Sequence, residues 1–233
     1  MSEVVQYQSE EKYALITLKN GKVNAISHEV IDGLNAALNK AEQTDKIVIL
    51  TGRPGIFSAG FDLKTMTKST DAAKELVTKG SELSLRMLSF PMPIIIACSG
   101  HAIAKGAFML LYADYRIGVA GDFKIGLNEV MIGMTMIYTG IEVARARLAP
   151  VFFERSINNS EIYTSKDAVS AGFLDAVVSE KELLPTAIQT AMLFAKLDRK
   201  AHAATKLRLR KPYLDKIKNA IDLDLKSEIA INS

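Results

Sequence analysis

The sequence predicts an α/β fold in which most strands are buried. Short apolar runs that suit strands alternate with longer segments whose apolar residues recur at helical spacing. The run from Ile94 to Cys98 has no charged or hydrogen-bonding polar side chain, as expected of a strand that is covered on both faces. From Ser179 the alternation ends, and two amphipathic segments rich in Lys and Arg continue to the C-terminus. We therefore expect an α/β core over residues 1–178 and a helical region over residues 179–233.

The first half of the chain supplies strands and helices in turn. We expect strands over 4–7, 13–18 and 47–51, with a polar turn between the first two. Ser27 precedes a segment with helical spacing of its apolar residues, and serine is a favoured N-cap residue. A second helix is expected to end near Phe90, because Pro91 and Pro93 cannot continue it.

The second half continues the pattern. Strands are expected over 94–98, 115–119 and 173–178, and the very apolar stretch 106–113 suits a buried helix. Short helices are expected after Thr139 and Ser165. Two amphipathic helices should follow Ser179, and the second carries basic residues on its surface.

Composition excludes several classes of function. Apolar residues make up 48% of the chain and charged residues 24%, with a net charge of +3, which is typical of a globular protein and too small to argue for a nucleic-acid partner. No apolar run approaches the roughly 20 residues that cross a bilayer, so no membrane segment is expected. The single Cys98 cannot form an internal disulfide and fits a reducing compartment. The polar N-terminus resembles no signal or transit peptide, so a cytoplasmic location is expected.

Motifs for several common chemistries are missing. The chain has no G-x-G-x-x-G or G-x-x-x-x-G-K-[ST] for nucleotides and no G-x-S-x-G nucleophile elbow. His28, His101 and His202 lack the spacing of metal ligands, and Cys98 has no partner. We therefore expect no metal and no dinucleotide cofactor.

Two turns share one design. Residues 56–62 (IFSAGFD) and 99–107 (SGHAIAKGA) both leave a strand through small residues, and the second opens a helix. Small residues let backbone N–H groups approach a ligand, and a helix N-terminus adds unpaired donors. Two such donors aimed at one carbonyl oxygen would form an oxyanion hole, each worth roughly 2.7–4 kcal/mol toward a developing negative charge. Tight packing alone is the commoner reason for such a turn.

These turns, with further motifs in the same order, resemble the crotonase (enoyl-CoA hydratase/isomerase) superfamily. The shared segments are V-N-A at 23–25, F-S-A-G-F-D-L, PIIIACSGHAIAKGA, A-D-Y-R-I, G-L-N-E-V-M-I-G and A-V-S-A-G-F-L-D-A-V-V. The resemblance implies a spiral of ββα units with a C-terminal helical region that builds trimers, often paired into hexamers. It also implies an acyl-CoA thioester as substrate, with no separate cofactor. By position, the oxyanion donors would be the amides of Ala59 and Lys105, the latter at a position where the family normally has Gly.

The resemblance also assigns the catalytic acid. Hydratases of the family use two glutamates. The first lies two residues after the glycine that is Gly106 here, and this chain has Phe108 at that position. The second falls on Glu129, in a G-L-N-E motif that is similar to that of Δ3,Δ2-enoyl-CoA isomerases, which work with one glutamate. A single carboxylate within reach of C2 and C4 can move a double bond, whereas hydration also needs a positioned water. Phe108 should make this corner apolar and raise the pKa of Glu129.

Other residues have two interpretations each. Gly106, Phe108, Asp62 and Tyr138 are expected to bind substrate. Asp62 and Lys64 could equally belong to a solvated loop, and Tyr138 with Thr139 could be plain packing rather than the acyl pocket. The basic residues of the last helix either meet the phosphates of coenzyme A or form a solvated helix face; they are Lys206, Arg208, Arg210 and Lys211.

Three functions remain after this reading. The leading hypothesis is an isomerase that converts 3-enoyl-CoA to 2-enoyl-CoA with Glu129 as the proton shuttle. An enoyl-CoA hydratase, or another crotonase reaction in which a different side chain supplies the second acid, is the nearest alternative. The third is a catalytically weak protein that binds CoA thioesters or serves as a scaffold.

Overall fold

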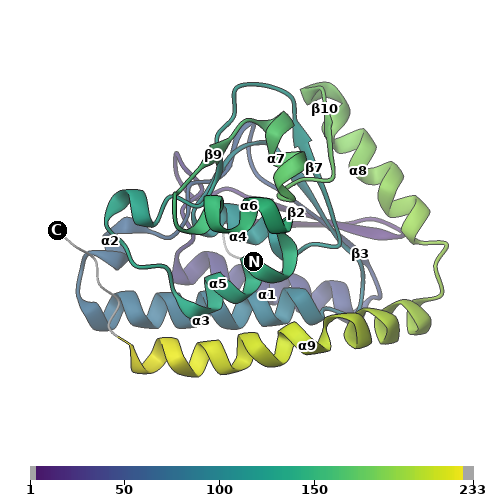
Figure 1. Cartoon of the computed structure of the whole chain (residues 1–233). Helices are drawn as coiled ribbons and strands as arrows, with labels where there is room; N and C mark the ends of the chain where they lie inside the picture. Colours follow the sequence, from purple (N-terminus) through teal and green to yellow (C-terminus); the bar gives the residue numbers. More distant parts are fainter. Residues whose placement is uncertain (1–3, 228–233) are drawn as a thin grey trace.

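The computed structural model describes residues 4–227, which fold into two β-sheets with helices around them (Figure 1). The larger sheet has the strand order β1 (Val5–Ser9), β2 (Tyr13–Leu18), β3 (Ile47–Thr51), β5 (Ile94–Cys98), β7 (Tyr115–Val119) and β10 (Ala176–Val178). The smaller sheet has the order β4 (Gly55–Ser58), β6 (Gly100–Ile103), β8 (Ile125–Gly126) and β9 (Ile162–Tyr163).

The helices cover both sheets and end in a long C-terminal element. They are α1 (His28–Gln43), α2 (Leu63–Met66), α3 (Thr70–Ser89), α4 (Lys105–Tyr112), α5 (Tyr138–Arg147), α6 (Pro150–Ile157), α7 (Ser165–Ala171), α8 (Glu180–Phe194) and α9 (Arg199–Lys226), with a 3-10 turn η1 (Val130–Ile132). No helix in residues 4–227 is both long and apolar enough to cross a membrane. Within the same residues, no three His, Cys, Asp or Glu side chains gather as a metal site would require.

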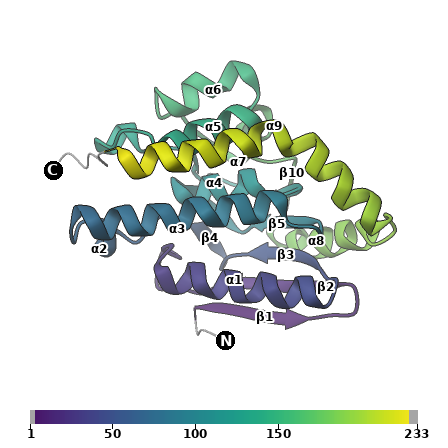
Figure 2. The ribbon, with the colours of Figure 1, turned by 90° about the horizontal axis from the view of Figure 1, so that it is seen from below.

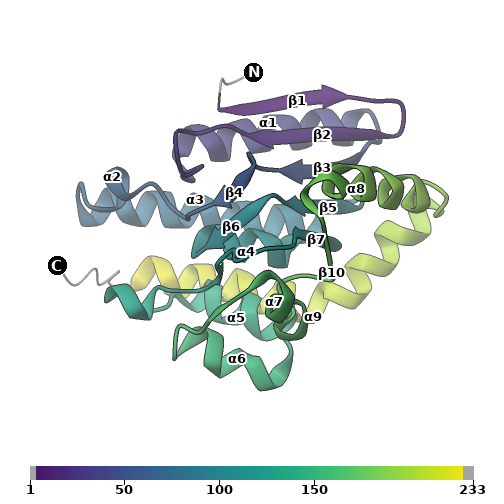
Figure 3. The same cartoon turned by 90° about the horizontal axis from the view of Figure 1, so that it is seen from above.

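A ββα unit recurs along the chain and brings the two turns of interest together. β3 and β5 pair in parallel in the larger sheet, and each continues directly into β4 or β6 of the smaller sheet. β4 and β6 are also parallel neighbours (Figure 3), and the register places Gly55 opposite Gly100. The turns that follow them, 59–62 and 104–105, therefore lie beside each other. The expected α/β spiral of ββα units is confirmed.

Most predicted elements form, and one strand is shorter than expected. Every residue of β5 is buried, and the Ser27 hydroxyl caps α1 by accepting from the Val30 amide at 3.3 Å. The strand expected over 173–178 is limited to Ala176–Val178. The amides of Phe173 and Leu174 instead donate back to Ala168 O in α7, so they are not available to the sheet. Helix α6 was not anticipated.

The two C-terminal helices pack on the core. α8 contacts β3, β5 and β7, and α9 runs along α3 and α5 (Figure 2). Asp224, near the end of α9, caps α5: its carboxylate accepts from the Tyr138 amide at 2.7 Å and the Thr139 amide at 3.0 Å. α9 is thus joined directly to the start of α5.

Neither interpretation of the basic residues on α9 holds for Lys206 and Arg210. Their exposed fractions are only 5% and 4%, and both pair with the carboxylate of Asp114, at 2.7 and 2.8 Å. Buried cations need a partner to offset lost hydration, so these two residues tie α9 to the core and are neither solvated nor free for phosphates. Arg208 and Lys211 are exposed, as a solvated face requires.

Candidate active site

A narrow cavity of about 50 Å³ lies between α3, α4, α5 and the segment that follows β8, and we call it the Glu129 cavity. Its apolar walls include Phe61, Val77, Phe108, Met134, Met136 and Ile137. Its polar groups belong to Ser81, Lys105, Tyr112, Glu129, Thr135 and Thr139. A mostly apolar cavity with a few convergent polar groups is the usual form of a small-molecule site.

Glu129 reaches the cavity from the loop after β8. The loop closes on itself, because the Met134 amide donates to Glu129 O at 2.9 Å and Gly133 takes a left-handed conformation with φ 78°. The carboxylate oxygen Oε2 is buried and has no hydrogen-bond partner among the described residues. Burial raises the pKa of Glu129 to about 7, and nearby Lys105 partly opposes this effect. Such a carboxyl can accept and return a proton near neutral pH.

Phe108 lies on α4 and closes one side of the cavity with an aromatic ring. Its side chain is buried, and its ring lies so close to α5 that a Cβ at Gly140 would approach Phe108 Cζ to 2.9 Å. Phe108 and Glu129 therefore line the same cavity. Phe108 makes its side of the cavity apolar, and the polar side chains that line the cavity belong to other residues.

The two small-residue turns meet beside the cavity, but the available amides are not quite those predicted. The Ala59 amide already donates to Val23 O at 3.0 Å, so it is not free to bind a ligand. The Ile26 amide donates to Gly60 O, and the Asp62 amide donates to Ile26 O. The Phe61 amide between them has no acceptor among the described residues. The geometry replaces Ala59 with Phe61 as the candidate donor.

The second candidate donor is the amide of Lys105, the first residue of α4. It also has no acceptor within the described part of the chain. Ala104 before it has φ 51°, a strained value for a residue with a Cβ. The two turns are in contact, because a Cβ on Gly60 would lie 3.4 Å from Lys105 N. Paired free amides at one place can bind a developing oxyanion.

The Lys105 side chain lies in the cavity wall, rather than turning away from the site or extending to coenzyme A. Its Nζ donates to Gly80 O at 2.6 Å and to the Tyr112 hydroxyl at 2.9 Å. It also lies over the rings of Phe61 and Tyr112, 5.3 and 5.0 Å from their centroids. Burial lowers the pKa of Lys105 to about 7, while Glu129 acts in the opposite direction.

Three other residues predicted to bind substrate lie outside the cavity wall. Gly106 serves packing, because a Cβ there would approach Ser58 O to 2.2 Å. The Asp62 carboxylate caps α2 by accepting from the Thr65 amide and hydroxyl, at 3.1 and 2.7 Å. Tyr138 is 48% exposed, and its neighbour Thr139 reaches the cavity instead.

Sequence reasoning missed several residues of the cavity. Val77 and Ser81 lie four apart on α3, a spacing that indicates one helix face but not what it faces. Tyr112 follows Phe108 by four residues on α4, and this is the signal that could have placed it in the same wall.

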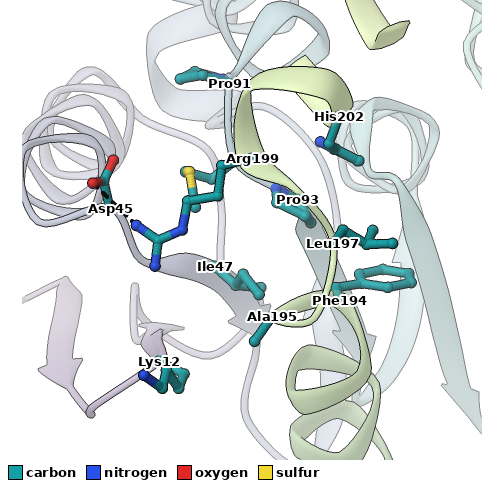
Figure 4. Close-up of a pocket in the computed structure, with 11 residues that line it drawn as sticks. Lys12, Asp45, Ile47, Pro91, Pro93, Phe194, Ala195, Leu197, Arg199 and His202 are labelled. Atoms are coloured by element: carbon teal, nitrogen blue, oxygen red, sulfur yellow. Dashed lines mark ion pairs between the residues drawn. The ribbon is translucent and has the colours of Figure 1, made fainter. Parts of the chain in front are cut away.

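A second hollow lies far from these groups, where the connection between α8 and α9 meets the ends of β2 and β3 (Figure 4). It measures about 10 Å³, enough for about one water molecule. The ion pair between Arg199 and Asp45 spans it at 3.0 Å, and both side chains are largely exposed. This second hollow is too small for a substrate, and its ion pair is exposed to solvent.

Comparisons with known proteins identify relatives of this chain. A family model described as "Enoyl-CoA hydratase/isomerase" matches residues 8–230. The crystal structure of an enoyl-CoA hydratase/isomerase family protein from Pseudomonas syringae superposes with a TM-score of 0.97 at 54% identity, over 98% of this chain and 99% of that one.

Among curated relatives, human mitochondrial enoyl-CoA delta isomerase 1 is 27% identical over 225 residues, which cover 94% of this chain and 74% of the relative. A probable enoyl-CoA hydratase from Bacillus subtilis is 30% identical over 188 residues, which cover 78% and 72%. The family model and these similarities confirm the resemblance seen in the sequence motifs. The chain belongs to the enoyl-CoA hydratase/isomerase family of the crotonase superfamily.

Proposed function

We propose that this protein is a Δ3,Δ2-enoyl-CoA isomerase, which converts 3-enoyl-CoA to 2-enoyl-CoA with Glu129 as both base and acid. The observation that carries the proposal is Glu129 itself: its buried Oε2 oxygen has no hydrogen-bond partner among the described residues, and it is the one acidic side chain among those that line the cavity. By its position in the family motif, Phe108 stands where a hydratase has the other of its two glutamates. Isomerases and hydratases are both among the relatives, so the choice between them rests on the residues of the cavity.

The reaction needs two proton transfers on one carboxylate. Glu129 removes a proton from C2, and the electron pair moves through the thioester to give a dienolate. The same carboxyl then returns a proton to C4, so that the double bond becomes conjugated with the thioester. A pKa of about 7 suits both steps, since the group is neither too weak a base nor too weak an acid.

The free amides of Phe61 and Lys105 would hold the thioester oxygen while it carries negative charge. Each donor of this kind is worth roughly 2.7–4 kcal/mol in the transition state. Both are backbone groups, so the side chain at position 105 does not change this role. Coenzyme A enters as part of the substrate, and the proton transfers use no further cofactor.

Turnover tests the proposal. Purified protein is offered a 3-enoyl-CoA and, separately, a 2-enoyl-CoA, and conjugation and hydration are followed by ultraviolet absorption and chromatography. We expect conversion of the first and no hydration of the second. Glu129→Gln should lower kcat for isomerisation by about 10²–10⁴, the usual range for a general acid–base group.

The matched control is Glu82→Gln, because Glu82 is an exposed carboxylate on α3; it should keep wild-type turnover. Isomerisation that survives Glu129→Gln would overturn the mechanism. Hydration of the 2-enoyl-CoA would favour a hydratase, and binding of both thioesters without turnover would favour a scaffold.

A further inference from the structure

The proposed isomerisation uses the backbone of Lys105 but leaves its side chain, and the hydroxyl of Thr139, without a role. Both groups line the Glu129 cavity and both are buried, with 5% and 3% of each residue exposed. Buried polar groups are normally paired, because each one left without a partner costs free energy. These two therefore call for a ligand that pairs with them.

The hydrogen bonds of Lys105 leave one donor over. In its charged form the Lys105 side chain has three N–H donors, and Nζ finds two acceptors, Gly80 O and the Tyr112 hydroxyl. No third acceptor occurs among the described residues. The position is also built for this side chain: a Cβ on Gly80 would come within 3.2 Å of Lys105 Cε and within 2.5 Å of the Phe61 ring.

Thr139 supplies the second unpaired group. Its Oγ1 has no hydrogen-bond partner within residues 4–227. Its backbone amide is held by the Asp224 carboxylate at 3.0 Å, which fixes the residue at the start of α5. Thr139 therefore lines the cavity from a backbone position that is held in place, and its buried hydroxyl is not part of any polar network in the described chain.

A plain hydrocarbon chain would leave both groups unpaired and would remove whatever water they hold. We infer that the Glu129 cavity takes acyl-CoA thioesters whose acyl chain carries an acceptor oxygen (a hydroxyl, carbonyl or carboxylate) that Lys105 Nζ and the Thr139 hydroxyl bind. The inference deepens the proposed function and rests on it, since it names the substrate class of the same site. Lys105 and Thr139 are, on this account, specificity-determining residues.

Binding of saturated thioesters tests the inference without any turnover. Titration calorimetry compares hexanoyl-CoA with adipoyl-CoA and ω-hydroxyhexanoyl-CoA, and butanoyl-CoA with succinyl-CoA. At one of the two lengths, the wild-type protein should bind an oxygen-bearing chain at least about tenfold tighter than the plain chain, as expected for a hydrogen bond to a charged group. Comparing ω-hydroxyhexanoyl-CoA with adipoyl-CoA shows whether the site prefers a neutral oxygen acceptor or a carboxylate.

Variants assign the preference to its residues. Lys105→Met should reduce the ratio of affinities to about threefold or less, and Thr139→Val should reduce it part of the way. Lys79→Met is the matched control: Lys79 precedes Gly80 on the same helix, but its side chain is 40% exposed and paired with Glu75. This variant should keep the full ratio.

The outcomes separate this inference from the proposed function. Equal or tighter binding of the plain chain at both lengths by the wild-type protein overturns the inference, even if a plain 3-enoyl-CoA is isomerised. An oxygen preference that depends on Lys105, in a protein that isomerises no 3-enoyl-CoA, supports the site while the proposed function fails. If Lys105→Met keeps the full preference for oxygen-bearing acyl chains, the acyl oxygen binds at another place, and the inference is overturned.

Discussion

Two regions of this molecule bury charged side chains, and they differ in whether the charges are fully paired. In the Asp114 cluster, Lys206 Nζ uses all three donors, on Phe90 O, Met92 O and Asp114 Oδ2, at 2.7–2.9 Å. Arg210 completes the cluster with bonds to Leu88 O and Asp114 Oδ1. In the Glu129 cavity, by contrast, Glu129 Oε2 has no partner among the described residues, and Lys105 has two acceptors for three donors.

The pKa values show what this difference means. Burial lowers the pKa of both lysines, to about 8 for Lys206 and about 7 for Lys105. For Lys206, the carboxylate of Asp114 works against the shift through its charge and a hydrogen bond. A buried charge whose partners come from the protein holds the fold together, whereas one that faces a cavity unpaired is available to a ligand or a reaction.

The largest expected effect tests the paired region. Asp114→Ala removes the carboxylate that Lys206 and Arg210 share, and so it leaves two buried cations without their anion. We expect a loss of about 3–5 kcal/mol in the free energy of unfolding, measured by urea denaturation. Asp215→Ala is the control, because Asp215 lies on the same helix in an exposed pair with Lys211 and should change stability by less than about 0.5 kcal/mol. Equal effects of the two variants would contradict the comparison.

A smaller effect, of opposite sign, is expected in the unpaired region. The pKa of Glu129 is about 7 in the folded protein, against 4.5 for a free glutamate. Stability from this group is therefore fully present below the unfolded pKa and is lost as the pH rises through about 7. Glu129→Gln cannot ionise, so it should be more stable than the wild type at about pH 8, on the order of 1–3 kcal/mol, and similar at about pH 4. Denaturation at both pH values measures this, and a less stable variant at the higher pH would refute the sign.

The smallest effect concerns the contact that joins the C-terminal helix to the cavity wall. Asp224→Ala removes the cap of α5, so we expect a loss of about 0.5–2 kcal/mol in stability. KM should rise as well, because the cap holds the amide of Thr139. Asp224→Asn retains one acceptor oxygen and should lose less of both. Unchanged KM in a destabilised Asp224→Ala protein would show that the cap serves the fold alone.

Much of the fold could be predicted from local patterns. The apolar run Ile94–Cys98 forms a strand with every residue buried, and Ser27 caps the helix that follows it. The strand pattern failed directly after α7, where the amides of Phe173 and Leu174 bond back to Ala168 O rather than extending β10. The smaller sheet was also missed as a sheet, since its strands are two to four residues long.

The candidate site could be located from the sequence, but not assembled. Family position placed Glu129 and Phe108 together, and both line one cavity. The same reasoning chose the Ala59 amide over that of Phe61. Which of two nearby amides is free depends on Val23 and Ile26, whose carbonyls bond to the Ala59 and Asp62 amides, and those pairings are not visible in a motif.

The sequence by itself determined the alternation of elements, the family, and the presence of Glu129 together with an aromatic residue, Phe108, at the position of the family's other glutamate. These follow from residue types and short spacings, which act locally. Only the tertiary structure decided which charges are paired. Lys105 and Lys206 are both basic residues in apolar surroundings. Lys206 meets the carboxylate of Asp114, 92 positions away in the chain, whereas Lys105 lies in the wall of the Glu129 cavity with neutral acceptors only. Burial makes an unpaired charge costly, and the partner that offsets the cost comes from a distant part of the fold.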